Sequence, residues 1–131
     1  MFTIEQIKAA HAKVKSGADF PKYIQDMKQL GVTSYQHYVA DGHIKYYGEN
    51  NFTISGDSKW EIRPVTDIGQ VSELKQILKT HQQGQTNYPT FCLQAAEIGV
   101  EKWVVDTQKM TCTYYDKAGK EMLVEAIPEL R

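Results

Sequence analysis

Few side chains in this sequence are suited to nucleophilic or metal chemistry. They are His11, His37, His43, His81, Cys92 and Cys112. No two histidines have HxH or HExxH spacing and the cysteines form no CxxC motif, so we expect neither a metal site nor a cofactor. One hypothesis is a small hydrolase or transferase that uses Cys92 or Cys112 as nucleophile and His81 as base. No nucleophile elbow or glycine-rich oxyanion turn accompanies either cysteine.

Two tyrosine pairs point to binding rather than catalysis. Tyr46-Tyr47 and Tyr114-Tyr115 each end a segment with β-strand alternation. Successive side chains of a strand point to opposite faces of a sheet, so one tyrosine of each pair faces the core and the other faces away. We expect Tyr47 and Tyr115 to face outward, where they could line an aromatic groove. Ordinary half-exposed strand tyrosines are the alternative interpretation.

Four further residues complete the candidate binding site. The whole candidate set is Tyr47, Tyr115, His43, Lys45, Trp103 and His81. His81 also fits a purely structural role, because a donor or cation near the end of a helix stabilises its terminal carbonyl groups. For the two cysteines, packing as small buried hydrophobic residues is the alternative to a chemical role.

The elements that must position these residues occur in the same order twice. In the first half, helical periodicity and caps predict helices over 3–15 and 20–30, the first opened by a Thr3–Gln6 capping box. Strands are expected at 35–39, 44–47, 52–54 and 60–62. In the second half, helices are expected from an Asp67–Gln70 capping box to Gly84 and over 87–98, followed by strands over 100–106, 110–115 and 121–127.

The two halves align at an offset of 68 residues. Asp19-Phe20-Pro21 then matches Asn87-Tyr88-Pro89, in which Asp19 and Asn87 are the expected helix N-caps. Leu30-Gly31-Val32 matches Ile98-Gly99-Val100. We therefore predict an α+β fold made by tandem duplication of an α-α-β-β-β unit, with halves at about 3–65 and 67–129. The expected architecture has antiparallel strands in one or two sheets, helices on one face and a pseudo-two-fold axis. Chance alignment of generic caps and glycines is the alternative.

Composition excludes several classes of protein. With 131 residues, 41% of them hydrophobic, the chain is expected to form one soluble domain. The formal net charge of −1 disfavours nucleic-acid binding. No apolar run approaches the roughly 20 residues of a membrane span, and no signal peptide is recognisable. We expect a cytoplasmic protein with reduced cysteines.

The second half also carries a family resemblance. The residues concerned are His81, Gln82, Gly84, Tyr88, Phe91-Cys92, Ala95-Ala96, Gly99-Val100, Trp103, Asp106, Thr111-Cys112, Tyr114-Tyr115-Asp116, Gly119 and Glu125-Ala126-Ile127-Pro128. In the first half Gly31-Val32, Tyr35, Tyr46 and Gly48 fit as well. This pattern resembles the YdfO-like family, a bacterial and prophage-associated domain of unknown function, of which some members are named phage envelope proteins. The resemblance implies a small α+β fold and transfers no catalytic residue.

The favoured hypothesis is a non-enzymatic module that binds a small molecule or a protein partner. Duplicated halves create a concave, symmetric surface, and exposed aromatic rings provide contact area at their junction. A homodimer is a further possibility, because a second subunit could cover the exposed rings.

Overall fold

The chain forms an α+β structure with one six-stranded antiparallel sheet. The computed structural model describes residues 2–15 and 19–127. Within this part, the helices are α1 (Ile4–His11), α2 (Phe20–Leu30), α3 (Val71–Gln82) and α4 (Tyr88–Glu97), with a short 3-10 helix η2 (Glu49–Asn51). The strands are β1 (Ser34–Tyr38), β2 (Ile44–Tyr47), β3 (Thr53–Ser55), β4 (Lys102–Asp106), β5 (Thr111–Tyr115) and β6 (Glu121–Ala126). Their order across the sheet is β3-β2-β1-β4-β5-β6.

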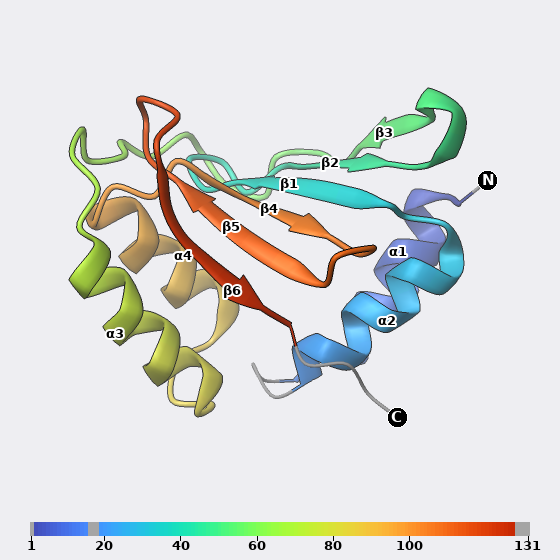
Figure 1. Ribbon diagram of the computed structural model, residues 1–131, viewed down its shortest axis with the longest axis horizontal. Coiled ribbons are helices and arrows are strands. Elements are labelled where there is room, and N and C mark those ends of the chain that lie inside the picture. Colours follow the sequence, from blue (N-terminus) through green and yellow to red (C-terminus); the bar gives the residue numbers. More distant parts are fainter. Residues whose placement is uncertain (1, 16–18, 128–131) are drawn as a thin grey trace.

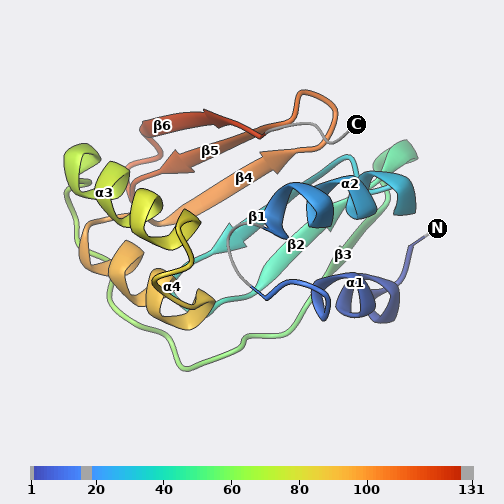
Figure 2. The same cartoon turned by 90° about the horizontal axis from the view of Figure 1, so that it is seen from below.

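All four helices lie against the same face of the sheet (Figure 1). Figure 2 shows two helix pairs, α1 with α2 on one side of the view and α3 with α4 on the other. The opposite face of the sheet carries no helix of the described residues. We call this opposite surface the open face.

The helix ends form largely as their residue types predict. Thr3 and Gln6 make a reciprocal capping box, with Gln6 N donating to Thr3 Oγ1 at 3.2 Å and Thr3 N donating to Gln6 Oε1 at 2.9 Å. Asn87 Oδ1 accepts from Thr90 N at 2.9 Å and so caps α4. Gly31 follows α2 in the left-handed conformation with φ +103°, where glycine avoids a Cβ penalty.

Three local predictions were wrong. Asp67 and Gln70 form no capping box, because α3 begins only at Val71 and Asp67 instead contacts Lys117 Nζ at 3.1 Å. Asp19 makes no side-chain cap on α2, and its Oδ2 accepts from Lys15 N. The segment predicted as a strand at 60–62 has no strand partner. Residues 16–18 and 128–131, including Pro128 and the end of the second predicted half, lie outside the described residues.

Strand alternation separates the core from the open face. On the helix side the buried sheet residues are Tyr35, His37, Ile44, Tyr46, Trp103, Val105, Cys112 and Tyr114. The helices contribute fully buried side chains to the same core, among them Ile24, Met27, Leu74 and Cys92. Tyr46 and Tyr114 therefore point inward as expected, while their neighbours Tyr47 and Tyr115 are half-buried on the other side.

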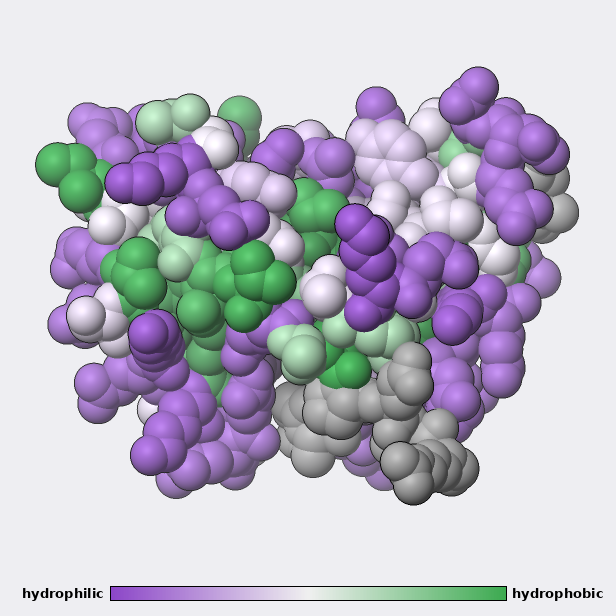
Figure 3. All heavy atoms as spheres, viewed as in Figure 1, coloured by the Kyte–Doolittle hydropathy of each residue, from purple (hydrophilic) through white to green (hydrophobic). Residues whose placement is uncertain are grey.

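The core reaches the surface at the β6 edge of the sheet. Met122 and Leu123 are partly buried against the core, whereas Val124 is exposed. Figure 3 shows hydrophobic residues gathered between α3 and β6. Val71, the first residue of α3, is also exposed.

Residues Ser58–Arg63 form a strap across the turn between β1 and β2. Lys59 N donates to Asp41 O at 2.8 Å, and Arg63 N donates to Ala40 O at 2.9 Å. The indole of Trp60 lies directly against Gly42, where an added Cβ would be 2.9 Å from the ring. These contacts anchor the segment without any strand pairing.

Candidate functional site

The open face carries a diagonal run of lysines and tyrosines, which we call the lysine–tyrosine strip. Its members are Tyr47 and Lys45 on β2, Gln36 and Tyr38 on β1, Lys102 on β4 and Tyr115 on β5. The register places them side by side, because Gln36 pairs with Lys45 while Lys102 pairs with both Tyr38 and Tyr115.

Lys102 is the centre of the strip. Its Nζ donates to Gln36 Oε1 at 3.1 Å and lies 5.7 Å from the ring centroid of Tyr38 and 5.6 Å from that of Tyr115. The Tyr38 hydroxyl donates to the same Gln36 oxygen at 2.9 Å. Lys102 therefore has cation–π contacts on both sides and an amide oxygen as acceptor, which hold its ammonium group in one place.

His43 extends the strip at the β1–β2 turn. Its ring stacks on Tyr38 with centroids 4.4 Å apart and planes at 4°. Its Nδ1 contacts Asp41 Oδ1 at 2.6 Å, and Ser58 Oγ donates to Asp41 Oδ2 at 2.8 Å. Burial raises the pKa of Asp41, but hydrogen bonds from the His43 backbone, the His43 ring and Ser58 outweigh it and lower that pKa to about 2.

The two lysines of the strip have no carboxylate partner. Among the described residues, side-chain ion pairs join Lys22 to Asp26, His43 to Asp41 and Lys117 to Asp67. Lys45 instead lies over the ring of Tyr47, 5.4 Å from its centroid. The strip is therefore a cationic and aromatic surface on a chain whose net charge is −1.

A model of a known family matches residues 8–126, almost the whole chain. Its description is "Protein of unknown function (DUF1398)". The chain belongs to the DUF1398 family. This description does not confirm the YdfO-like name or a phage association. A search of curated proteins found no match for this DUF1398 chain.

The structure brings four of the six predicted site residues of this DUF1398 chain onto the open face. Tyr47, Lys45, His43 and Tyr115 all lie along the lysine–tyrosine strip. Tyr47 and Tyr115 do not face one another. Tyr47 pairs with Ser34, at one end of β1. Tyr115 pairs with Lys102, which pairs with Tyr38 at the other end of β1. They mark the two ends of the strip rather than the walls of a groove.

Trp103 and His81 lie elsewhere. Trp103 is buried on the helix side of β4, where its ring stacks on His37 at a centroid distance of 4.0 Å. Because successive side chains of a strand point to opposite faces, Trp103 points to the helix side while Lys102 points to the open face. The assignment of Trp103 to the open face was therefore wrong. His81, at the end of α3, stacks on Phe91 and its Nδ1 contacts the Thr86 carbonyl oxygen at 3.0 Å.

Sequence reasoning missed Tyr38, Lys102 and Gln36. The alternation that located Tyr47 and Tyr115 also places these three residues on the open face. What the sequence lacked was the pairing of β1 with β4, which joins the two halves and brings Lys102 beside Tyr38. No local pattern records a contact between residues so far apart in the chain.

The cysteines of this DUF1398 chain are free, buried thiols. Burial raises the pKa of Cys92 and that of Cys112 to about 12 each, even though Tyr88 and Tyr114 hydrogen-bond to the respective sulfur atoms. Both are protonated at neutral pH, whereas a nucleophilic cysteine acts as the thiolate. His81 contacts Thr86 and Phe91 instead of activating either thiol.

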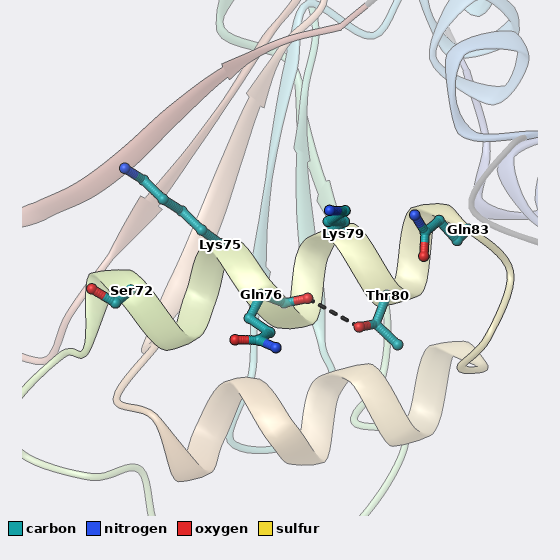
Figure 4. A pocket seen from close by; sticks show the side chains of 6 residues that line it. All are labelled: Ser72, Lys75, Gln76, Lys79, Thr80 and Gln83. Carbon is teal, nitrogen blue, oxygen red and sulfur yellow. Dashed lines mark hydrogen bonds between the residues drawn. The ribbon is translucent and has the colours of Figure 1, made fainter.

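Other sites for small molecules or metals are poorly developed. A shallow hollow of about 520 Å³ is lined by Ser72, Lys75, Gln76, Lys79, Thr80 and Gln83. Five of them lie on α3 and Gln83 directly follows it, and Figure 4 shows the six spread along the helix without converging on one point. In residues 2–15 and 19–127, no group of three or more His, Cys, Asp or Glu side chains could hold a metal ion. In the same residues, no helix is long and apolar enough to cross a membrane.

Proposed function

We propose that this DUF1398 chain is a non-catalytic binding module whose open face holds an acidic segment of a partner protein. The observation that carries the proposal is the lysine–tyrosine strip, in which two lysines without carboxylate partners lie among half-exposed tyrosine rings. Carboxylates of the partner would accept hydrogen bonds from Lys102 and Lys45.

The shape and composition of the strip favour a protein partner over a small molecule. The strip crosses four strands on a face that no helix of the described residues covers. Tyrosine combines a large apolar ring with a hydroxyl, which is why it is enriched at protein interfaces. Small molecules bind in concave pockets that enclose most of their surface, and the strip is a sheet surface.

We further infer that the chain is an internal duplication and that the strip crosses the junction of its halves. The element order α-α-β-β-β occurs twice. From the centre of the sheet outward, the strands follow in the order β1, β2, β3 in the first half and β4, β5, β6 in the second. At an offset of 68 residues, Gln36 corresponds to Val104, and these two residues pair directly at the centre of the β1–β4 ladder.

Backbone hydrogen bonds around this centre support the same inference. Val39 N donates to Glu101 O and Thr107 N donates to Thr33 O, both at 3.0 Å. At the offset of 68 residues, Val39 corresponds to Thr107 and Thr33 corresponds to Glu101. Each of the two bonds is therefore the counterpart of the other, as a two-fold relation between the halves requires.

The strip does not follow the repeat. At the same offset, the lysines at 45 and 102 correspond to Thr113 and Ser34, so neither has a basic counterpart. The duplicated sheet therefore carries one cationic strip instead of two symmetric ones. Such a difference within a duplicated framework is consistent with a single binding surface.

A titration of the isotope-labelled protein with hexaglutamate tests the proposal. We expect amide chemical shifts to change along β1, β4 and β5 near Lys102, and the effect to weaken at high salt because exposed charges are screened. The variant Lys102→Gln should lose most of the effect. The matched variant Lys75→Gln, at an exposed position of α3, should retain it.

Two results would overturn the proposal. One is the absence of shifts on the open face, or shifts that Lys102→Gln leaves unchanged. The other is a stronger response of the same face to an oligothymidylate than to hexaglutamate, which would assign the strip to nucleic acid.

A further inference from the structure

The register of the sheet fixes the spacing of the two lysines of the strip. Lys45 on β2 pairs with Gln36, and Lys102 on β4 pairs with Tyr38, two residues further along β1. Strands β2 and β4 lie on either side of β1. With about 4.8 Å between neighbouring strands and about 3.4 Å between successive residues of a strand, the Cα atoms of the two lysines are about 12 Å apart.

The two ammonium groups stay apart because each has its own contacts. Lys102 Nζ donates to Gln36 Oε1 at 3.1 Å. Lys45 Nζ instead lies over Tyr47, 5.4 Å from the ring centroid. Because Tyr47 pairs with Ser34, this contact directs the Lys45 ammonium away from the end of β1 that Lys102 flanks. A partner segment that engages both lysines in this arrangement must therefore present two acidic groups about 12 Å apart.

The backbone beneath the strip favours a helix as the partner segment. Strands β1, β2, β4 and β5, which carry the strip, each pair with a strand on both sides. Their N–H and C=O groups are used within the sheet, so an extended segment lying across this face would leave the backbone groups that it buries without partners. An α-helix satisfies its backbone internally and presents side chains. A segment that paired as a strand would have to add at β3 or β6, the two edges of the sheet.

An α-helix also matches the spacing of the lysines. Its rise of about 1.5 Å per residue places residues seven positions apart on the same face and about 10.5 Å from one another. The flexible four-carbon stem of lysine accommodates the small difference from the Cα spacing. The positions three and four residues after the first acidic residue lie on the same helix face. They would lie over Gln36 and Tyr38, which flank the midpoint between the two lysines.

We infer, on the basis of the proposed function, that the segment held by the lysine–tyrosine strip is an amphipathic helix with two acidic residues seven positions apart and an apolar residue between them. The acidic residues would bind Lys45 and Lys102, and the apolar residue would pack on the ring of Tyr38. The strip lies on the face that no helix of the described residues covers, so the partner helix displaces none of them (Figure 1).

Two peptides of identical composition test the spacing. Each is about 20 residues long, rich in alanine and glutamine, and contains two glutamates and one leucine. In the first peptide the glutamates are seven positions apart on one helix face, with the leucine between them. In the second they are nine positions apart, on opposite faces. Circular dichroism checks that the two peptides are equally helical.

The first peptide should bind at least about threefold more tightly in titrations followed by amide chemical shifts, because only it engages both lysines at once. Lys45→Gln should remove this preference. Lys75→Gln, at an exposed position of α3, should retain it. A proline in the middle of the first peptide breaks the helix and should weaken binding at least about threefold.

The inference is overturned if the wild-type protein binds the two peptides equally well, if Lys45→Gln retains the preference, or if the proline-containing peptide binds as tightly as the first. The peptide comparisons use the wild-type protein and do not depend on how a variant folds. Failure of the proposed function gives a different result, because hexaglutamate would then cause no shifts on the open face that depend on Lys102. In that case the inference fails with it.

Discussion

Gly31 and Gly99 end their helices in the same left-handed conformation but meet different surroundings. A Cβ on Gly31 would contact only Phe2, at 3.8 Å, whereas a Cβ on Gly99 would lie 2.6 Å from the Ile68 carbonyl oxygen. We expect Gly31→Ala to lower the free energy of unfolding by about 1 kcal/mol, and Gly99→Ala by roughly 3 kcal/mol, because backbone must move. Urea denaturation measures both, and equal losses would contradict the difference in surroundings.

The two thiols should be unreactive in the folded protein. Both are buried, with pKa values of about 12, so little thiolate forms at neutral pH. A thiol reagent should modify Cys92 and Cys112 slowly in the native state and rapidly in urea. Fast modification of either cysteine under native conditions would reopen a nucleophilic role.

The hydrogen-bonded Asp41 should make stability depend on pH in the acid range. Its pKa is lowered from 3.8 to about 2 in the folded protein, so its contribution is present above pH 3.8 and is lost as the pH falls toward 2. Asp41→Asn should therefore flatten the decline in melting temperature between pH 4 and 2. A decline of the same slope in the variant would show that other groups cause it.

At the scale of the elements, the two faces of β2 and β5 should respond differently to the same substitution. Replacing the half-exposed Tyr47 and Tyr115 together by serine should leave unfolding cooperative and cost less than about 2 kcal/mol. Replacing the buried Tyr46 or Tyr114 by serine removes an aromatic ring from the core and should cost about 3–5 kcal/mol for each. Denaturation curves compare the sets directly, and a larger loss for the outward pair would reverse the face assignment.

The elements differ in how well local sequence predicts them. Helix ends were predicted where one side chain caps its own helix, as Thr3 and Asn87 do. The Asp67 prediction failed because the backbone at 66–70 is held by α4 instead, with Thr66 N donating to Ala96 O and Gln70 N donating to Ile98 O. The strap was mistaken for a strand because its partner is a turn, which no alternation of residues reveals.

At the scale of the whole molecule, Thr107 ties the second half to the first. Its side chain is fully buried, and its hydroxyl lies 2.6 Å from Val32 O and 2.9 Å from Thr33 O. Thr107→Val keeps the shape and removes the hydroxyl, leaving the Val32 carbonyl without this donor, and should cost about 1–3 kcal/mol. Thr113→Val, on the half-exposed side of β5, is the control and should change stability by less than about 0.5 kcal/mol. Similar effects for the two variants would mean that the Thr107 hydroxyl contributes little to the junction.

The sequence by itself determined the α+β class, the order of the four helices and six strands apart from one extra strand at 60–62, and the face on which most strand residues lie. These properties depend on neighbours within a few positions, through caps, glycines and period-two alternation, so they can be derived from local spacing. It thereby placed Tyr47, Lys45 and Tyr115 outward, although the same rule was misapplied to Trp103.

Only the tertiary structure decided which residues lie together across the sheet. The pairing of β1 with β4 joins Lys102 to Tyr38 and Gln36, and the strap brings the ring of Trp60 to within 6.1 Å of that of Tyr88. Both contacts link residues distant in the chain, and they depend on the summed packing of helices and strands instead of on local patterns. The lysine–tyrosine strip is therefore a property of the assembled sheet, because strand order and register are set by the core as a whole.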